Sequence, residues 1–233
     1  MDLLPLLKNI AVSLKQAIAA PVHVTKLQSK YPTCHLYPGV QLDDATTLAG
    51  YNVIFANTSI TNSVIGRHSF IQKNSRILNA DIGKFCSISS RVSIGLGRHA
   101  TSMVSSHPAF YSSSQPVAKT FCSTDDYTPF KRISIGNDVW IGENVMIMDG
   151  VKIGNGAVIA MGSVVTGNIP DYAVVAGNPA RVFMSRFDDE TKKKLLASCW
   201  WDRSEEWLAE HWTSFSDPSR FLALLDDEKG RRE

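Results

Sequence analysis

Residues 136–165 read GNDVWIGENVMIMDGVKIGNGAVIAMGSVV, and an aliphatic residue recurs at every sixth position through this stretch. Together with Ile135, which precedes the stretch, the recurring positions are Ile141, Ile147, Ile153, Ile159 and Val165. A six-residue repeat is too short for a helix pair or a propeller blade, so it predicts a β-helix in which each hexad supplies one strand and one corner. We expect the aliphatic residues to point inward and the small residue after each of them to occupy a tight turn.

The same rhythm is present upstream of this stretch. Its aliphatic positions are Leu36, Leu42, Leu48, Ile54, Ile60, Ile65, Ile71, Ile77, Ile82, Ile88 and Ile94. Most steps are six residues long, but the steps from Ile60 to Ile65 and from Ile77 to Ile82 are five. The sequence gives no reason for the position of these short steps. Together the two runs predict an all-β solenoid with parallel strands over residues 34–183.

Residues 95–132 interrupt the repeat, which returns at Ile133. This segment is polar and Ser-rich, and it contains Pro108, Pro116 and Pro129. A connection longer than about 15 residues inside a compact domain is usually functional or disordered. We therefore expect an extended loop that leaves the coil and rejoins it.

Helical caps are expected at both ends of the coil, residues 1–33 and 184–233, because a solenoid needs covered ends. Near the N-terminus, apolar residues lie close to one helical face: Leu4, Leu7, Ala11, Leu14 and Ile18. A helix packed on the open end of the coil is favoured over a membrane-surface anchor, since its polar face has few cations.

Capping signals predict helices after Arg186. These signals are Asp188, the pair Asp202 and Glu205, and Asp217-Pro218. Four tryptophans of this region are expected to pack the cap, with an aromatic substrate platform as the alternative: Trp200, Trp201, Trp207 and Trp212.

The composition is that of an ordinary soluble protein. The 233 residues carry a formal net charge of +2 without a long run of one sign, which argues against a nucleic acid partner. The four cysteines show no metal-type spacing, so we expect no bound metal. The chain also has no Gly-rich phosphate-binding motif. The N-terminal residues resemble neither a signal peptide nor a membrane span. We expect a reduced, cytoplasmic chain.

The flat faces of such a coil offer no pocket, so chemistry is expected in the loop or between subunits. The loop contains His99 at its root and His107 further out. A neutral imidazole accepts a proton near neutral pH, which makes either histidine a candidate general base. From spacing alone, ordinary surface histidines fit equally well.

The segments NDVWIG, GSVVTG and AGNPARV closely resemble those of the hexapeptide-repeat acyltransferases. DIGKFCSI, the histidine-bearing loop and CWWD resemble the xenobiotic or chloramphenicol/streptogramin acetyltransferase subgroup, which includes many sugar O- and N-acetyltransferases. The resemblance covers about residues 36–205. It implies a left-handed β-helix, acetyl-CoA lying along the coil, and a homotrimer with active sites between subunits.

The resemblance also implies roles for single residues. The family's catalytic histidine falls on His99 in GLGRH, where it would act as general base in a direct transfer without an acyl-enzyme. His107 falls on an acceptor-side segment and is interpreted as a substrate contact or a residue behind one.

The cofactor contacts implied by the resemblance are Trp140, Gly142, Ala160, Met161, Thr166, Pro179 and Arg181. Trp140 would line the pantetheine groove, although an outward Trp filling a subunit interface fits equally well. Arg181 would meet a phosphate at the nucleotide end. The family often has Lys where this chain has Gly167, and Lys131, Arg132 and Arg186 are candidates to replace it.

These observations lead us to expect an acetyl-CoA-dependent O-acetyltransferase acting on a sugar of a surface polysaccharide or its precursor. The alternative enzyme is an antibiotic acetyltransferase or a nucleotide-sugar N-acetyltransferase. The alternative from another class is a non-catalytic β-helix scaffold, which would need neither His99 nor an intact cofactor face. The sequence does not identify the acceptor.

Overall fold

The computed structural model describes residues 26–114 and 117–230, so most of the helical segment expected over residues 1–33 lies outside the described residues. Residues 26–30 are helical, and the Leu27 side chain packs into the first coil. The hydroxyl of Tyr31 donates to the carbonyl of Thr46 at 3.0 Å. These contacts hold this short helical stretch against the N-terminal end of the coil. Within the described residues, no helix is long and apolar enough to cross a membrane.

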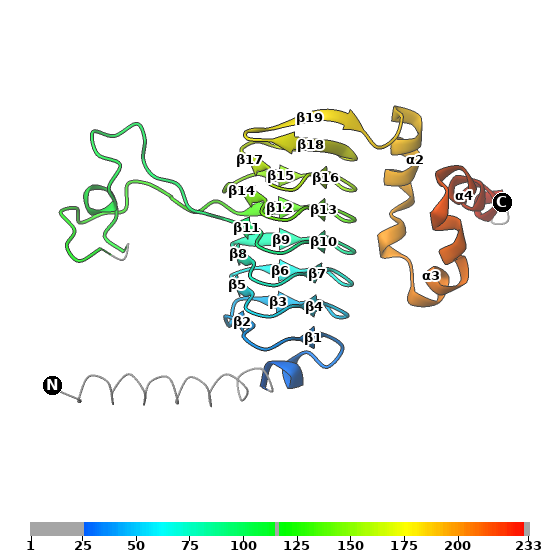
Figure 1. The fold of residues 1–233 in the computed structure, drawn as a ribbon, viewed down its shortest axis with the longest axis horizontal. Helices are drawn as coiled ribbons and strands as arrows, with labels where there is room; N and C mark the ends of the chain where they lie inside the picture. The colour runs from blue at the N-terminus through cyan, green and yellow to red at the C-terminus, as the bar shows by residue number, and fades with distance from the viewer. Residues whose placement is uncertain (1–25, 115–116, 231–233) are drawn as a thin grey trace.

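The body of the chain is a left-handed parallel β-helix with three faces (Figure 1). The eight-stranded face contains β1 (His35–Leu36), β4 (Val53–Ile54), β7 (Phe70–Ile71), β10 (Ser87–Ile88), β13 (Trp140–Ile141), β16 (Val158–Ile159), β18 (Ala173–Gly177) and β19 (Ala180–Ser185). The six-stranded face contains β2 (Gln41–Leu42), β5 (Ser59–Thr61), β8 (Arg76–Leu78), β11 (Ser93–Ile94), β14 (Met146–Ile147) and β17 (Val164–Val165). The five-stranded face contains β3 (Thr47–Leu48), β6 (Val64–Ile65), β9 (Ala80–Ile82), β12 (Ile133–Ile135) and β15 (Lys152–Ile153). Every pairing is parallel except the hairpin of β18 with β19.

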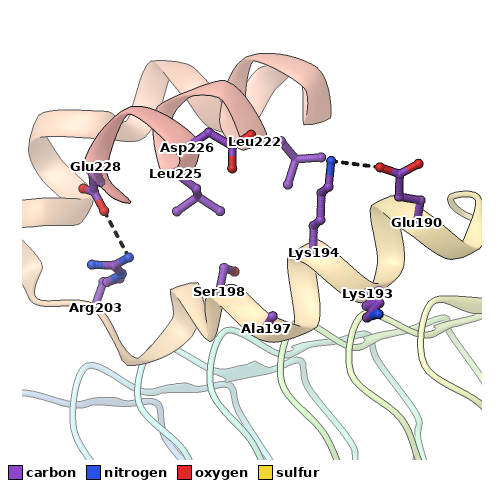
Figure 2. A pocket seen from close by; sticks show the side chains of 10 residues that line it. All are labelled: Glu190, Lys193, Lys194, Ala197, Ser198, Arg203, Leu222, Leu225, Asp226 and Glu228. Carbon is purple, nitrogen blue, oxygen red and sulfur yellow. Dashed lines mark hydrogen bonds and ion pairs between the residues drawn. The ribbon is translucent and has the colours of Figure 1, made fainter. Parts of the chain in front are cut away.

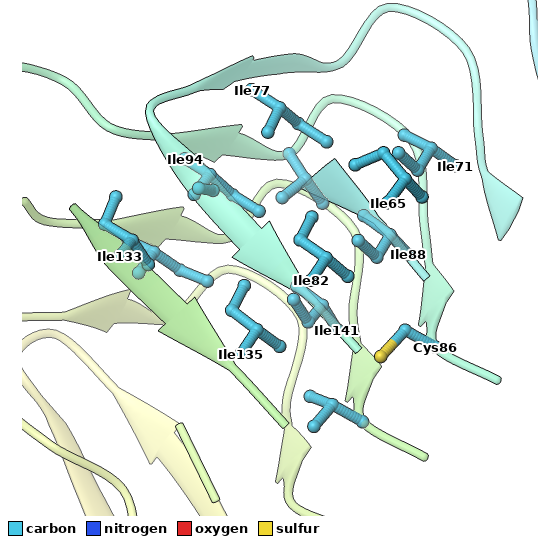
Figure 3. Close-up of a cluster of buried hydrophobic side chains, with 14 of the residues drawn as sticks. Ile65, Ile71, Ile77, Ile82, Cys86, Ile88, Ile94, Ile133, Ile135 and Ile141 are labelled. Atoms are coloured by element: carbon cyan, nitrogen blue, oxygen red, sulfur yellow. The ribbon is translucent and has the colours of Figure 1, made fainter. Parts of the chain in front are cut away.

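The predicted inward positions form the core of the coil. Ile54, Ile71, Ile88, Ile141 and Ile159 are fully buried and stack along one face, because each pairs in register with its equivalent one coil away. Figure 3 shows such isoleucines converging on the axis, with Cys86 among them. Burial raises the pKa of the Cys86 thiol to about 12, so this thiol is an uncharged packing group.

The small residues after the aliphatic positions stand at the start of the turns: the amide of Ser69 donates to the carbonyl of Gly66 at 3.4 Å, and that of Ser163 to the carbonyl of Ala160 at 3.3 Å. At most of the six-residue steps, the residue with left-handed φ lies three places after the aliphatic position, as at Asp138 with φ 56° and Asn144 with φ 59°. Gly142 has a different role, because a Cβ there would lie 2.5 Å from the backbone nitrogen of Met161 in the next coil. Glycine is therefore required at position 142 by the close stacking of coils.

The two five-residue steps lie at one corner, between the six- and five-stranded faces. There β5 leads to β6 through Asn62, and β8 leads to β9 through Asn79, both with positive φ. The side chain of Asn62 donates to that of Asn79 at 3.0 Å. In the next coil the whole loop 95–132 leaves from this same corner, which we call the loop corner. The short steps thus form the part of the coil beneath the loop.

The loop projects away from its own coil (Figure 1). It contains one short helical turn, η1 (Pro108–Phe110). Where it returns, Arg132 binds the carboxylate of Asp81, and its guanidinium also donates to the carbonyl of Asn62 and the side chain of Asn79. The end of the loop is therefore attached to the loop corner of the coils beneath it.

The C-terminal elements are α2 (Asp189–Ser198), η2 (Trp200–Asp202), α3 (Glu205–His211), η3 (Trp212–Ser216) and α4 (Pro218–Gly230). They lie beside the coil, on the side opposite the loop (Figure 1). Asp188 caps α2 as predicted, but Ser204 caps α3, where we expected Asp202. Asp202 lies in η2, where its carboxylate pairs with Lys84 of the coil at 2.8 Å.

A ladder of stacked rings attaches these helices to the corner between the five- and eight-stranded faces. His68 stacks on Phe85 with centroids 4.6 Å apart, and Phe85 contacts Trp200 at 5.2 Å. Glu205 accepts from His68 at 2.8 Å. Trp201 is buried, but Trp212 is 70% exposed and does not pack the helices as expected.

Tyr172 joins the last coil to the helices and carries a buried hydroxyl that has no hydrogen-bond partner among the described residues. Burial, with the nearby Asp138 carboxylate, raises the pKa of Tyr172 to about 12. An unpaired buried hydroxyl costs free energy. We expect Tyr172→Phe to leave the free energy of unfolding at neutral pH unchanged or to raise it by up to about 1 kcal/mol.

The stability of the protein at alkaline pH should also differ between Tyr172→Phe and the unmodified protein. The unfolded tyrosine loses its proton at a lower pH than the native one, so its contribution to stability falls as pH rises from about 10 towards 12. The loss of stability between about pH 9 and 10.5, measured by urea unfolding, should be smaller in Tyr172→Phe. A large loss of stability in this variant at neutral pH would contradict the unpaired state of the hydroxyl.

Candidate active site

His99 lies at the root of the loop with its ring held by two contacts. Its Nδ1 lies 2.8 Å from the carbonyl oxygen of Ser106 and 3.2 Å from the hydroxyl of Tyr111. A carbonyl oxygen only accepts, so Nδ1 carries the proton and Nε2 of the neutral ring has a free lone pair. The residue is exposed, and its Nε2 has no partner among the described residues. The tautomer and orientation are those that a general base requires.

Tyr111 links His99 to a small pocket within the loop. Its ring is 1% exposed and meets the ring of Tyr127 edge-on, with centroids 5.3 Å apart. Tyr127 lines a pocket of about 410 Å³ together with Ser112, Ser114, Asp125, Thr128, Pro129 and Phe130. The sequence did not single out these residues, because the contacts join positions that have no periodic relation.

Asp125 is the charged group of this loop pocket. Its Oδ1 accepts from the hydroxyl of Ser112 at 2.7 Å and from the amide of Ser113 at 2.8 Å. The hydrogen bond from Ser112, followed by that from Ser113, holds the pKa of the Asp125 carboxyl below its ordinary value. The pocket therefore presents a carboxylate, hydroxyls and aromatic rings.

His107 has a structural contact that the sequence did not indicate. Its Nδ1 accepts from the amide of Ala109 at 3.2 Å and so caps η1. In the neutral ring the proton then lies on Nε2, which makes this exposed side chain a donor at its outer edge. The two histidines therefore have opposite tautomers.

The residues assigned to the cofactor lie mostly at another corner. Trp140 on β13 points outward and is 51% exposed. Gly142 stacks directly against Ala160 and Met161 of the next coil, at the corner between the eight- and six-stranded faces. We call this the hairpin corner, because the turn of the β18–β19 hairpin, which contains Pro179, lies above it. Thr166 is apart from this group, at the loop corner after β17.

The cations near these residues differ in their partners. Arg132 is held by Asp81, and Arg186 donates to Asp138 at 3.1 Å and to the carbonyl of Gly156 at 2.8 Å. Arg181 is exposed and donates to the carbonyl of Ala180, and it forms no ion pair within the described residues.

A different pocket, of about 460 Å³, lies between α2 and α4 (Figure 2). Four of its charged side chains pair with one another, Arg203 with Glu228 at 3.1 Å and Lys194 with Glu190 at 3.0 Å, while Lys193 and Asp226 also line it. It is larger than the loop pocket, but it belongs to the helices, which lie on the side of the coil opposite the loop (Figure 1). Most of its charged side chains are already paired within the helical region, whereas His99 offers an unpaired ring nitrogen, so the loop root is the better candidate for chemistry.

Comparison with known proteins places the chain in a family. Residues 132–167 match the family "Bacterial transferase hexapeptide (six repeats)". A probable macrolide acetyltransferase of Lysinibacillus sphaericus is 40% identical over 157 residues, covering 65% of this chain and 79% of that protein. A chloramphenicol acetyltransferase of Klebsiella aerogenes is 43% identical over 128 residues, covering 54% of this chain and 60% of that protein. The chain belongs to the hexapeptide-repeat transferases, with acetyltransferases among its relatives.

Coverage of these relatives is partial. The chain spans about 60% of the length of the chloramphenicol acetyltransferases that it matches. A hexapeptide-repeat-containing acetyltransferase from Vibrio cholerae, solved in complex with acetyl coenzyme A, superposes with a TM-score of 0.49 at 27% identity. That superposition covers 62% of this chain and 72% of the other.

Proposed function

We propose that this chain transfers an acetyl group from acetyl-CoA to a hydroxyl of a sugar in a surface polysaccharide or its precursor. The observation that carries the proposal is the exposed His99, whose Nδ1–H is held by the Ser106 carbonyl at 2.8 Å so that Nε2 is left as the acceptor. The chain's relatives named chloramphenicol and macrolide acetyltransferases support an acetyl group as the group transferred.

In the proposed reaction His99 acts as general base. The acceptor hydroxyl oxygen attacks the carbonyl carbon of the acetyl thioester while its proton passes to Nε2. The carbon–sulfur bond breaks, and the proton returns from Nε2 to the departing thiolate. The Ser106 carbonyl stabilises the charged ring between these two transfers, because it accepts from Nδ1.

The loop pocket favours a sugar as the acceptor. Sugars present many hydroxyls, and the Asp125 carboxylate with its neighbouring serines offers matching acceptors and donors. The rings of Tyr127 and Phe130 supply apolar surface in the same pocket. In this proposal His107 contacts the acceptor through its Nε2–H. An antibiotic acceptor, supported by the relatives' names, is the second candidate.

Acetyl-CoA would lie along the hairpin corner. Trp140, Gly142, Ala160 and Met161 would border the pantetheine arm. Pro179 and Arg181 would lie towards the nucleotide, and Arg181 would meet a phosphate. Thr166, at the loop corner, would reach the nucleotide of a cofactor held by a neighbouring subunit. Lys131 remains the candidate to replace the missing lysine at Gly167, since Arg132 and Arg186 are engaged elsewhere. We also propose a cytoplasmic location, which suits the four free cysteines.

A homotrimer would bring the two corners together. In one chain His99 leaves from the loop corner, whereas most of the cofactor residues lie at the hairpin corner, with the six-stranded face between them. The outward positions of the eight-stranded face are largely apolar: Val53, Phe70, Trp140, Val158 and Val174. Such a face suits burial against another subunit.

We therefore expect light scattering to give three times the chain mass of 25.6 kDa at micromolar concentration. Trp140→Lys, on the apolar face, should weaken this assembly, whereas Lys152→Glu on the five-stranded face serves as a control for an outward charge change. A stable monomer of the unmodified protein would count against a site shared between subunits.

The function itself is tested by an acceptor screen. Sugars, nucleotide-sugars and chloramphenicol would be incubated with acetyl-CoA, and the release of CoA thiol measured. Thiol release with a sugar hydroxyl supports the proposal, and release with chloramphenicol alone supports the second candidate. A scaffold would not bind CoA, so absence of CoA binding by calorimetry would refute both.

A further inference from the structure

Asp149 lies where the backbone ladder of the coil ends and the loop begins. Just after β11, the amide of Gly95 donates to the carbonyl of Ile147 at 3.1 Å, which continues the pairing of β11 with β14. Two residues later the amide of Gly97 donates to Oδ2 of Asp149 at 2.7 Å. The carboxylate thus replaces the backbone carbonyl as the acceptor at the point where the chain leaves the coil.

The segment that leads the loop back to the coil passes over the same residue, Asp149. The amide of Arg98 donates to the carbonyl of Pro129 at 3.0 Å, and the amide of Gly150 donates to the carbonyl of Lys131 at 3.2 Å. A Cβ at Gly97 would lie 2.9 Å from the ring of Phe130. The two segments of the loop therefore lie side by side over Asp149, which is only 4% exposed.

Stability alone does not account for a carboxylate at this position. Its Oδ1 is buried and has no hydrogen-bond partner among the described residues. A carboxylate that loses its water and gains a single hydrogen bond is less favourable than an apolar side chain of the same size. A buried side-chain acceptor that binds a loop amide next to a candidate active site is more readily explained by a role in the site.

The local sequence explains why such a constraint is needed. Gly95 and Gly97 both have φ of +77°, a region that glycine enters freely, so the segment Gly95-Leu96-Gly97 has little conformational preference of its own. His99 follows this segment by two residues. Without an external anchor, the direction in which the loop departs, and with it the position of the His99 ring, would vary.

We propose that Asp149 is a positioning residue for His99, which it orients by holding the Gly97 amide. The inference rests on the proposed function, in which His99 is the general base. Asp149 touches neither the reacting atoms nor the imidazole in this assignment. Its role requires a hydrogen-bond acceptor at Oδ2 and does not require the negative charge.

Two substitutions separate these requirements. Asp149→Asn keeps an acceptor oxygen for the Gly97 amide, and Asp149→Leu keeps the size but removes the acceptor. We expect kcat to fall about tenfold in Asp149→Leu, because small displacements of a catalytic group lower the rate steeply. We expect Asp149→Asn to stay within about twofold of the unmodified protein, since the acceptor is retained. The melting temperature of Asp149→Leu should change little, because relief from burying the carboxylate is offset by the Gly97 amide that loses its acceptor.

Hydrogen exchange provides a readout that does not depend on activity. The amide of Gly97 should be protected in the unmodified protein and in Asp149→Asn, and should exchange faster in Asp149→Leu. Mass spectrometry of peptides spanning residues 95–99 would follow this amide. If Asp149→Leu fails to fold, Asp149→Ala provides the same loss of acceptor in a smaller side chain.

The outcomes distinguish this inference from the proposed function. Full activity of His99→Ala would refute the general base and with it the basis of the inference. An inactive His99→Ala together with a fully active Asp149→Leu would overturn the positioning role alone. Equal loss of activity in Asp149→Asn and Asp149→Leu would also overturn it, because the charge would then be the essential feature.

Discussion

Replacing His99 with alanine is expected to lower turnover by ~10²–10⁴-fold while leaving the affinity for acetyl-CoA largely intact. The imidazole is the proposed acceptor of the hydroxyl proton, and its Nε2 is kept available by the contact of Nδ1 with the Ser106 carbonyl. The proposed cofactor residues lie mostly at a different corner of the coil, so binding should survive. Steady-state kinetics with thiol detection and calorimetry of CoA binding would measure the two quantities.

His107→Ala is the matched control for this experiment. It removes an imidazole from the same loop, together with the cap that Nδ1 provides to the amide of Ala109. We expect it to affect the Michaelis constant of the acceptor more than turnover. Near-normal turnover in His99→Ala, with His107→Ala inactive, would move the general base to His107.

The second large effect is expected for Arg181→Glu, which should raise the Michaelis constant for acetyl-CoA by at least about tenfold while changing turnover little. Arg181 is exposed beside the turn of the β18–β19 hairpin, and no ion pair within the described residues competes for its guanidinium. A contact with a phosphate remote from the thioester is equally strong in the ground and transition states, so its loss weakens binding alone.

The size of this effect follows from the contact that would be lost. A hydrogen bond to a charged group contributes about 1.5–3 kcal/mol, and each 1.4 kcal/mol corresponds to about tenfold in binding. Repulsion between the new carboxylate and phosphate adds to the loss. Arg220→Glu, an equal charge change on α4, controls for net charge. An unaltered Michaelis constant in Arg181→Glu would remove Arg181 from the proposed cofactor site.

The amino-acid sequence alone was sufficient to predict the coil. The spacing of Ile135, Ile141 and Ile147 identifies the inward positions, because each hexad repeats the same strand and corner regardless of its neighbours. The helix begun by Asp188 was predictable for the same reason, since a side chain capping an amide three residues away is a local interaction. The family followed from motifs that lie within single coils.

Local signals gave wrong or incomplete answers where two coils or two segments meet. Gly142 was assigned to a turn, but its size is set by the backbone of Met161 one coil away. Asp202 looked like a cap for α3, yet in the fold it pairs with Lys84, which lies 118 positions earlier in the chain. Neither partner can be identified from the spacing within one segment.

The arrangement around the candidate site was decided only by the tertiary structure. The sequence placed His99 at the root of a loop, but its tautomer depends on the Ser106 carbonyl seven positions away. Asp149 showed no signal at all, because it meets Gly97 across 52 positions of chain. Periodicity reports which residues face the axis of the coil. The orientation of a loop depends instead on which backbone amides are left unpaired once the coils have stacked, and on the side chains that then accept from them.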